Sequence, residues 1–191
     1  MKRKAIIISI KGIKLTKMES NIFSREKPWG VILFKRNLKT VKQIKKLTSK
    51  IRKLTKNSQF PIIIDEEGGG VSRLKKIINH NLSASFFGEL YKKNKNFCLS
   101  ILAVYIKSLS SILKDLGVNI NTIPVLDVLR RDTNKIIGRR SFSRDKNIVK
   151  ALGTHVVKNL NINKIGGVIK HIPGHGSSKL DSHKIRPKVS L

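Results

Sequence analysis

The sequence has 191 residues, with 41 Lys and Arg against 11 Asp and Glu, a formal net charge of +30 and one cysteine. This length suits one domain with its own core, and a hydrophobic content of 39% excludes a disordered chain. The lone Cys98 excludes a disulfide framework and a zinc site of paired cysteines. No apolar run is long enough for a membrane span or a secretory signal, so we expect a cytoplasmic protein without a membrane partner.

The positive charge has two explanations. A large excess of Lys and Arg usually indicates a nucleic acid or an anionic membrane as partner. Here the basic residues are spread along the whole chain, and aromatic residues, which stack on bases in binders of single strands, make up only 5%. We therefore predict unspecific electrostatic binding of nucleic acids, but no specific recognition.

Short apolar runs alternate with helical patterns along the chain. In chain order we expect a strand at 5–10, a strand at 30–34, a helix at 40–56 capped by Thr40, a strand at 61–65, a helix at 96–116 ended by Gly117, a strand within 118–128, a helix at 147–161 and a strand at 166–171. This alternation is typical of a parallel sheet of βα units. In such folds the chemistry lies at the carboxyl ends of the strands.

An acidic, glycine-rich segment follows the third expected strand. Asp65, Glu66 and Glu67 are consecutive, and three glycines and Arg73 follow. Adjacent carboxylates repel one another, and glycine allows both a sharp turn and the close approach of a ligand. A solvated acidic turn is the alternative explanation of this segment.

Two further segments carry single candidate residues. Asp127 ends the fourth expected strand, where an isolated carboxylate is more often structural than functional. Arg140 follows a glycine turn, and its fork of donors suits a polar ligand. In so basic a chain, a surface arginine is the better explanation of Arg140 when this segment is considered alone.

The segment from residue 170 to residue 183 carries three of the five histidines, His171, His175 and His183. Asp181 lies two residues before His183, a spacing at which a carboxylate can orient and charge an imidazole for proton transfer. A metal site built on the three histidines is a second interpretation, although glycine and proline exclude the zinc-hydrolase helix here. A solvated loop is the third.

Taken together and in order, these segments resemble glycoside hydrolase family 3. The similarity covers nearly the whole chain, through residues 12–19, 29–37, 65–74 and 170–183. It implies that residues 1–191 are the N-terminal barrel domain of the family, an α/β domain of the (β/α)8 TIM-barrel type. Five expected strands are too few to close such a barrel. We therefore expect an incomplete barrel of about the first five βα units, truncated at its C-terminal side.

The resemblance also implies roles for individual residues. His183 matches the general acid/base and Asp181 its partner in an Asp-His dyad. The nucleophilic aspartate of the family lies further along its chain, and no residue here matches it. The resemblance implies no cofactor and no metal. The residues matched to substrate binding are Asp65, Arg73, Arg140, Lys170 and His171.

The activity that the resemblance implies is a retaining β-N-acetylhexosaminidase. Its bacterial cytoplasmic members remove terminal β-linked N-acetylglucosamine from peptidoglycan fragments during cell-wall recycling. An inactive sugar-binding remnant, without the nucleophile, is the alternative. Because an open parallel sheet exposes its edge, we also expect self-association or a companion chain that completes the barrel.

Overall fold

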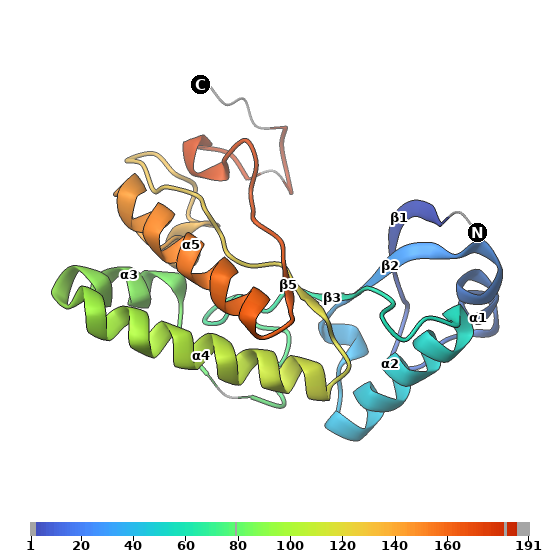
Figure 1. The fold of residues 1–191 in the computed structure, drawn as a ribbon. Coiled ribbons are helices and arrows are strands. Elements are labelled where there is room, and N and C mark those ends of the chain that lie inside the picture. Colours follow the sequence, from blue (N-terminus) through green and yellow to red (C-terminus); the bar gives the residue numbers. More distant parts are fainter. Residues whose placement is uncertain (1–2, 79, 182, 187–191) are drawn as a thin grey trace.

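A computed structural model describes residues 3–78, 80–181 and 183–186. Its centre is one parallel sheet with the strand order β1-β2-β3-β4-β5 (Figure 1). All five expected strands are confirmed, but the last three are short, and beyond β4 and β5 a single bridge joins Val125 to Lys170. Pro124, which has no N–H to donate, interrupts the ladder here. The strands are β1 (Lys4–Ser9), β2 (Pro28–Leu33), β3 (Ile62–Ile64), β4 (Ile120–Asn121) and β5 (Gly166–Gly167).

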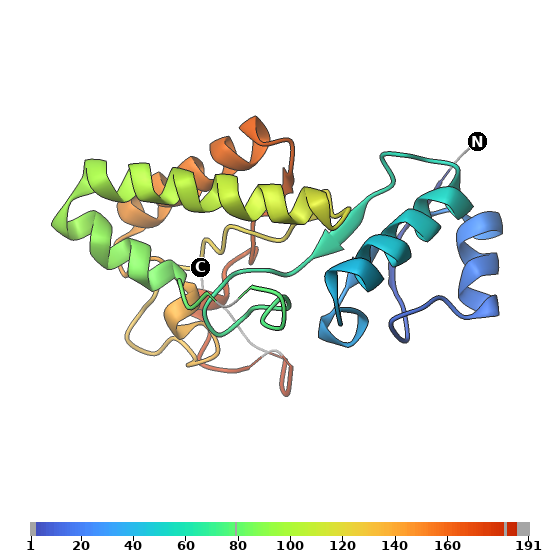
Figure 2. The ribbon, with the colours of Figure 1, turned by 90° about the horizontal axis from the view of Figure 1, so that it is seen from below.

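The three expected helices are confirmed, and two more are present. They are α1 (Lys17–Asn21), α2 (Val41–Thr55), α3 (Ala84–Lys93), α4 (Lys95–Asp115) and α5 (Lys146–Ile162). Thr40 caps α2 as expected, since its side chain accepts a hydrogen bond from the amide of Gln43. Seen from two directions, β1, β2, α1 and α2 lie at one end of the molecule and α3, α4 and α5 at the other (Figures 1 and 2).

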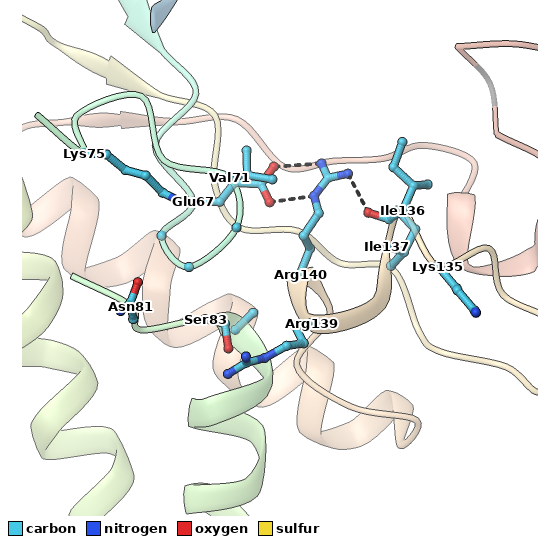
Figure 3. A pocket seen from close by; sticks show the side chains of 14 residues that line it. Glu67, Val71, Lys75, Asn81, Ser83, Lys135, Ile136, Ile137, Arg139 and Arg140 are labelled. Carbon is cyan, nitrogen blue, oxygen red and sulfur yellow. Dashed lines mark hydrogen bonds and ion pairs between the residues drawn. The ribbon is translucent and has the colours of Figure 1, made fainter. Parts of the chain in front are cut away.

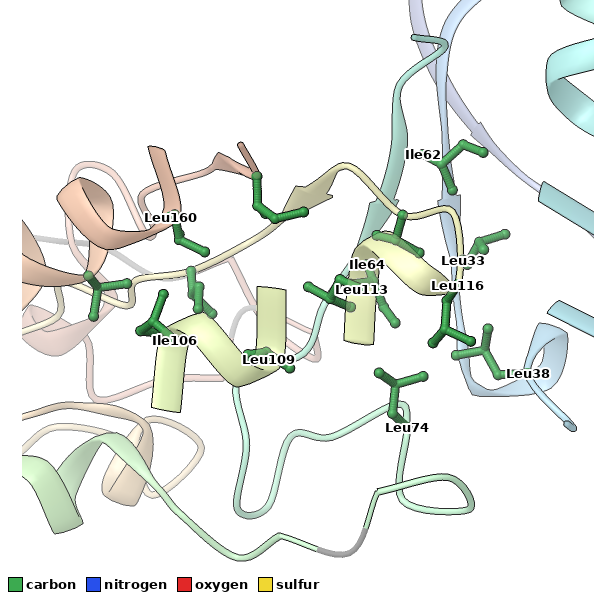
Figure 4. Close-up of a cluster of buried hydrophobic side chains, with 14 of the residues drawn as sticks. Leu33, Leu38, Ile62, Ile64, Leu74, Ile106, Leu109, Leu113, Leu116 and Leu160 are labelled. Carbon is green, nitrogen blue, oxygen red and sulfur yellow. The ribbon is translucent and has the colours of Figure 1, made fainter. Parts of the chain in front are cut away.

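Helix α4 connects the two ends through the core. Its buried residues Leu109 and Leu113 belong to one cluster of buried side chains with Ile64 of β3 and Leu160 of α5 (Figure 4). Each such side chain contributes about 1.5–3 kcal/mol by leaving water. By length and composition alone α4 also passes as a membrane span. Because its apolar stripe packs on the sheet and on α3 and α5, we interpret it as the core helix of a globular domain.

The sheet is open in the part of the chain that the structure describes. β1 and β5 are its outer strands, and no described residue pairs with the free edge of β5. Just beyond β5, Val168 and Ile169 are 42% and 46% exposed. The carboxyl ends of β3, β4 and β5 therefore form one short row next to an uncovered edge.

Candidate functional site

Asp65 is the centre of a polar cluster at the carboxyl ends of the last three strands. Its Oδ2 accepts a hydrogen bond from Arg73 Nη2 at 2.6 Å. Its Oδ1 accepts from Thr122 Oγ1, just past β4, at 2.8 Å, and from Lys170 Nζ, beyond β5. Burial alone would raise the pKa of Asp65, but the charge and hydrogen bond of Lys170, aided by Thr122 and Arg73, hold that pKa below its ordinary value of 3.8. The carboxylate is therefore ionised at neutral pH.

Glu67 lies on the other side of Lys170. It accepts two hydrogen bonds from Arg140, Nε to Oε2 and Nη2 to Oε1, both at 2.8 Å (Figure 3). Lys170 Nζ lies 2.6 Å from Glu67 Oε1 and so bridges Glu67 and Asp65. Hydrogen bonding to Glu67 raises the pKa of Arg140 despite partial burial. Such bidentate, charge-assisted pairs fix both side chains in place.

Glu66 points away from this cluster. Its buried Oε2 accepts from the amides of Arg73 and Leu74 at 2.7 and 2.8 Å, and His80 Nε2 lies 3.1 Å from Oε1. Each of the three consecutive carboxylates thus has its own arrangement of donors, and Lys170 lies between Asp65 and Glu67. The mutual repulsion of the carboxylates is offset by these donors, and the segment is not a solvated acidic turn.

Asp127 has a larger part in the site than sequence reasoning gave it. Its side chain is fully buried. Oδ2 lies 2.6 Å from His171 Nδ1, and Oδ1 accepts from the amides of His175 and Gly176 at 2.6 and 3.1 Å. Burial raises the pKa of Asp127, but the hydrogen bond and charge of His171, with the two amides, bring it below 3.8. Arg140 Nη2 lies 3.4 Å from His171 Nε2 and connects the two halves of the cluster.

The structure therefore brings together all five residues that were matched to substrate binding. Thr122, Glu67 and Asp127 join them. Sequence reasoning singled out Glu67 and Asp127 as carboxylates without matching either to substrate binding, and it did not name Thr122. The position of Asp127 at a strand end was the one signal available for it. Thr122 has a short, common side chain and gave no signal at all.

Asp181 and His183 form a separate pair. Asp181 Oδ1 lies 2.7 Å from His183 Nδ1 and also accepts from the amide of His183. These two contacts, the amide first, lower the pKa of Asp181. The side chain of His183 is 73% exposed. Within the described ranges, neither side chain joins the hydrogen-bond network around Asp65, so the structure forms the dyad but does not bring it to the cluster.

A cavity of about 600 Å³ adjoins the cluster and shares Glu67 and Arg140 with it (Figure 3). The glycines 68–70 and Arg139 also line it. The carboxylates can accept hydrogen bonds from neighbouring hydroxyl groups, and the Lys and Arg side chains beside them can donate to such groups, which is the chemistry that a sugar requires. Among the described residues, no group of three or more His, Cys, Asp or Glu side chains is arranged to hold a metal ion.

A row of paired charges at the carboxyl ends of parallel strands, beside a polar cavity, defines an α/β protein with a ligand site of the TIM-barrel type. The comparison with family models is more specific. The glycosyl hydrolase family 3 N-terminal domain matches residues 4–191, so the chain belongs to this family. Its fold is part of that TIM-barrel-like domain, as expected, and incomplete in this chain.

Curated relatives support the same family. The beta-hexosaminidase of Xanthomonas campestris pv. campestris is 30% identical over 178 residues, which is 93% of this chain and 53% of the relative. The beta-hexosaminidase A of Pseudoalteromonas piscicida is 34% identical over 179 residues, 89% of this chain and 29% of the relative. This chain thus spans about half the length of the first relative, and less of the second.

Solved structures are also similar. NagZ from Neisseria gonorrhoeae has a TM-score of 0.89 at 29% identity, covering 97% of this chain and 54% of that chain. A glycoside hydrolase family 3 beta-N-acetylglucosaminidase from Paenibacillus sp. str. FPU-7 has a TM-score of 0.79 at 27% identity, covering 93% of this chain and 33% of that chain.

Proposed function

We propose that the protein acts as a β-N-acetylhexosaminidase-like glycoside hydrolase that removes terminal β-linked N-acetylglucosamine from peptidoglycan fragments. The observation that carries the proposal is the cluster of Asp65, Lys170, Arg73 and Arg140 at the carboxyl ends of β3–β5. The names of the relatives support it, and NagZ was also crystallised in complex with N-trifluoroacetyl-D-glucosamine.

In this proposal Asp65 accepts hydrogen bonds from sugar hydroxyls, while Lys170 and Arg73 donate to sugar oxygens. The imidazole of His183, oriented by Asp181, protonates the leaving oxygen and then takes a proton from the attacking water. A retaining mechanism also needs a nucleophile, usually a carboxylate about 5–5.5 Å from the acid/base in enzymes that use two carboxylates. No residue of this chain is matched to that role, so in this chain alone water attacks the anomeric carbon directly as the protonated leaving group departs, without a glycosyl-enzyme intermediate.

A second candidate function is sugar binding without hydrolysis. The observation that favours it is the separation of Asp181 and His183 from the hydrogen-bond network of the cluster within the described residues. In this case the cluster holds the sugar and no glycosidic bond is broken.

Two measurements on the purified chain decide between these functions. Turnover of a fluorogenic N-acetyl-β-glucosaminide, abolished by His183→Ala, supports the hydrolase. Calorimetric binding of N-acetylglucosamine without turnover supports the second function. If the chain neither binds N-acetylglucosamine nor hydrolyses the substrate, both candidate functions are overturned. Asp132→Asn, an exposed carboxylate paired with Lys179, is the control variant and should behave as the wild type.

The proposal includes a cytoplasmic location and no specific nucleic-acid partner. Cys98 is a buried free thiol, as is usual in a reducing compartment. Cell fractionation tests the location. Gel shifts test the partner, because unspecific binding should be equal for unrelated DNA sequences and should disappear as salt rises.

A further inference from the structure

Arg52, in the last turn of α2, is a partly buried cation without an anionic partner. Among the described residues, its guanidinium has no hydrogen-bond or ion-pair partner, and its Nε is fully covered. Burial lowers the pKa of Arg52 below its ordinary value. An exposed cation is solvated by water, whereas a partly buried one usually pairs with a carboxylate or binds an anion. The chain supplies no carboxylate to Arg52 in the part that the structure describes.

A polar pocket of about 570 Å³ adjoins Arg52. It lies between the C-terminal half of α2, the turn that follows α2, and the end of α4. Gly117 allows the guanidinium to pack here, since its φ is +77° and a Cβ would lie 2.5 Å from Thr48 Oγ1 and 2.9 Å from Arg52 Nη1. Among the described residues that line the pocket, none has an apolar side chain. The wall of this pocket is therefore close-packed backbone and polar side chains.

The pocket carries a surplus of positive charge. Four cationic side chains and one carboxylate line it, and that carboxylate, Asp115, is already paired with Lys45 at 2.5 Å. The C-termini of α2 and α4 each add a partial negative charge of about half a unit. These partial charges offset about one of the three cations that are left, Arg52, Lys53 and Lys56. The pocket therefore attracts an anion.

The donors around the pocket favour a phosphate group. A guanidinium presents a planar fork of N–H groups that matches two phosphate oxygens, and lysines add charge beside it. The hydroxyls of Ser49 and Ser58 also line the pocket. Its volume is much larger than one phosphate ion, and its polar lining suits a second group that carries hydroxyls. A nucleobase would need an aromatic ring to stack on, and no described residue of the lining is aromatic.

We propose that this basic pocket binds a sugar phosphate, with the phosphate held by Arg52, Lys53 and Lys56 and the sugar hydroxyls directed at Ser49 and Ser58. The pocket lies just before β3 and β4, whereas the cluster around Asp65 follows the carboxyl ends of the same strands. The two sites are at opposite ends of the sheet. The inference therefore does not rest on the proposed hydrolase, and it can fail or hold independently of it.

Isothermal titration calorimetry on the purified chain tests the ligand. The probes are glucose 6-phosphate, inorganic phosphate and glucose, in about 0.15 M NaCl, where the screening length is about 8 Å and unspecific attraction is weak. We expect saturable 1:1 binding of glucose 6-phosphate, at least tenfold tighter than binding of either other probe. Vesicles that contain phosphatidylglycerol, and an unrelated DNA duplex, test a lipid headgroup and a nucleic acid as other sources of phosphate.

Matched double variants locate the binding. Lys53→Gln with Lys56→Gln removes two charges from the pocket, and Lys93→Gln with Lys107→Gln removes two exposed charges outside its lining. The first pair should weaken binding of glucose 6-phosphate at least tenfold, and the second should leave it within twofold. Arg52→Lys keeps the charge and loses the fork, so it should also weaken binding at least tenfold.

Lys56→Gly separates binding from folding. Lys56 is the C-cap of α2 in the left-handed region, at φ +49° and ψ +39°, where glycine is favoured. This variant should unfold at a higher temperature than the wild type and yet bind glucose 6-phosphate at least threefold more weakly. A variant that loses binding because it is misfolded cannot give this combination.

Four outcomes overturn the proposal. The first is an absence of saturable binding, and the second is equal affinity for glucose 6-phosphate and inorganic phosphate. The third is an equal loss of affinity in the two double variants, which would mean unspecific attraction to a basic chain. The fourth is binding of vesicles or DNA that only the pocket double variant weakens, which would assign the pocket to a lipid or a nucleic acid.

Discussion

At the scale of single residues, Asp127 connects a side chain of the site with the backbone of a following loop. One oxygen holds the imidazole of His171 and the other holds two amides of the segment at His175 and Gly176. The two ring nitrogens of His171 thus face different partners, with Nδ1 2.6 Å from Asp127 and Nε2 3.4 Å from Arg140. Asp127 thus positions a side chain and a backbone segment at the same time.

Asp127→Asn should destabilise the protein by about 1–3 kcal/mol, because an amide cannot accept from both sides and leaves buried donors without an acceptor. Binding of N-acetylglucosamine should weaken as His171 loses its fixed orientation. Urea denaturation and calorimetry measure the two effects. The exposed control Asp132→Asn should change stability by less than about 0.5 kcal/mol. Equal unfolding curves for both variants would contradict the assignment.

Asp65 and Asp127 also set the response to acid. Both have a pKa below the ordinary 3.8 in the folded state. A depressed pKa contributes stability that is present above the unfolded value and is lost as pH falls through the folded value. Asp65→Asn should therefore be less stable than the wild type at neutral pH, and this gap should narrow from about pH 5 to about pH 2. If urea unfolding gives the same difference in stability between wild type and Asp65→Asn across this pH range, the lowered pKa of Asp65 is contradicted.

The binding residues of the cluster were predicted from the family resemblance, and their places in the chain agree with it. Asp65 and Lys170 lie near the carboxyl ends of the strands expected at 61–65 and 166–171, where a parallel sheet collects its ligand groups, and Arg73 lies in the glycine-rich segment that follows Asp65. The contact of Glu67 with Arg140 depends on the conformations of two loops, and the local sequence pattern does not predict those conformations. The role of His183 stays a prediction, since its only side-chain partner among the described residues is Asp181.

At the scale of elements, long amphipathic helices were predicted within one or two residues of their ends. α2 and α4 carry apolar stripes together with Thr40 and Gly117 as end signals. Helix α3 was missed because of its Gly88 and because its apolar residues, Phe86 and Phe87, are adjacent rather than spaced. Tertiary packing explains why a glycine stands at position 88 inside this helix.

Gly88→Ala should destabilise the protein by at least about 2 kcal/mol, although alanine favours a helix by about 1 kcal/mol over glycine. A Cβ at this position would lie 1.7 Å from the carbonyl oxygen of Phe142, which is backbone and cannot rotate away. Gly70→Ala is the control, since nothing lies within 4 Å of a Cβ there. Thermal unfolding followed by circular dichroism compares the two variants. A smaller loss for Gly88→Ala than for Gly70→Ala would show that α3 packs differently.

At the scale of the whole molecule, charge repulsion opposes folding. The excess of 41 basic over 11 acidic residues leaves most cations without an acidic partner. Added salt screens this repulsion, and it also weakens the exposed ion pairs, which contribute little. The melting temperature should therefore rise by about 3 °C or more between low salt and about 0.5 M NaCl. A melting temperature that falls with salt would mean that the ion pairs outweigh the repulsion.

The position of the sugar cluster has a consequence for the open edge. Asp65, Thr122 and Lys170 follow the last three strands, so the proposed sugar would have protein on one side and the open edge of the sheet on the other. A polypeptide bound along β5 would cover the open side of the site and raise its affinity for the sugar. Because such coupling is reciprocal, the sugar would then raise the affinity of the chain for that polypeptide by the same factor. Under the proposed function, the affinity of the chain for N-acetylglucosamine would therefore report whether that edge is occupied.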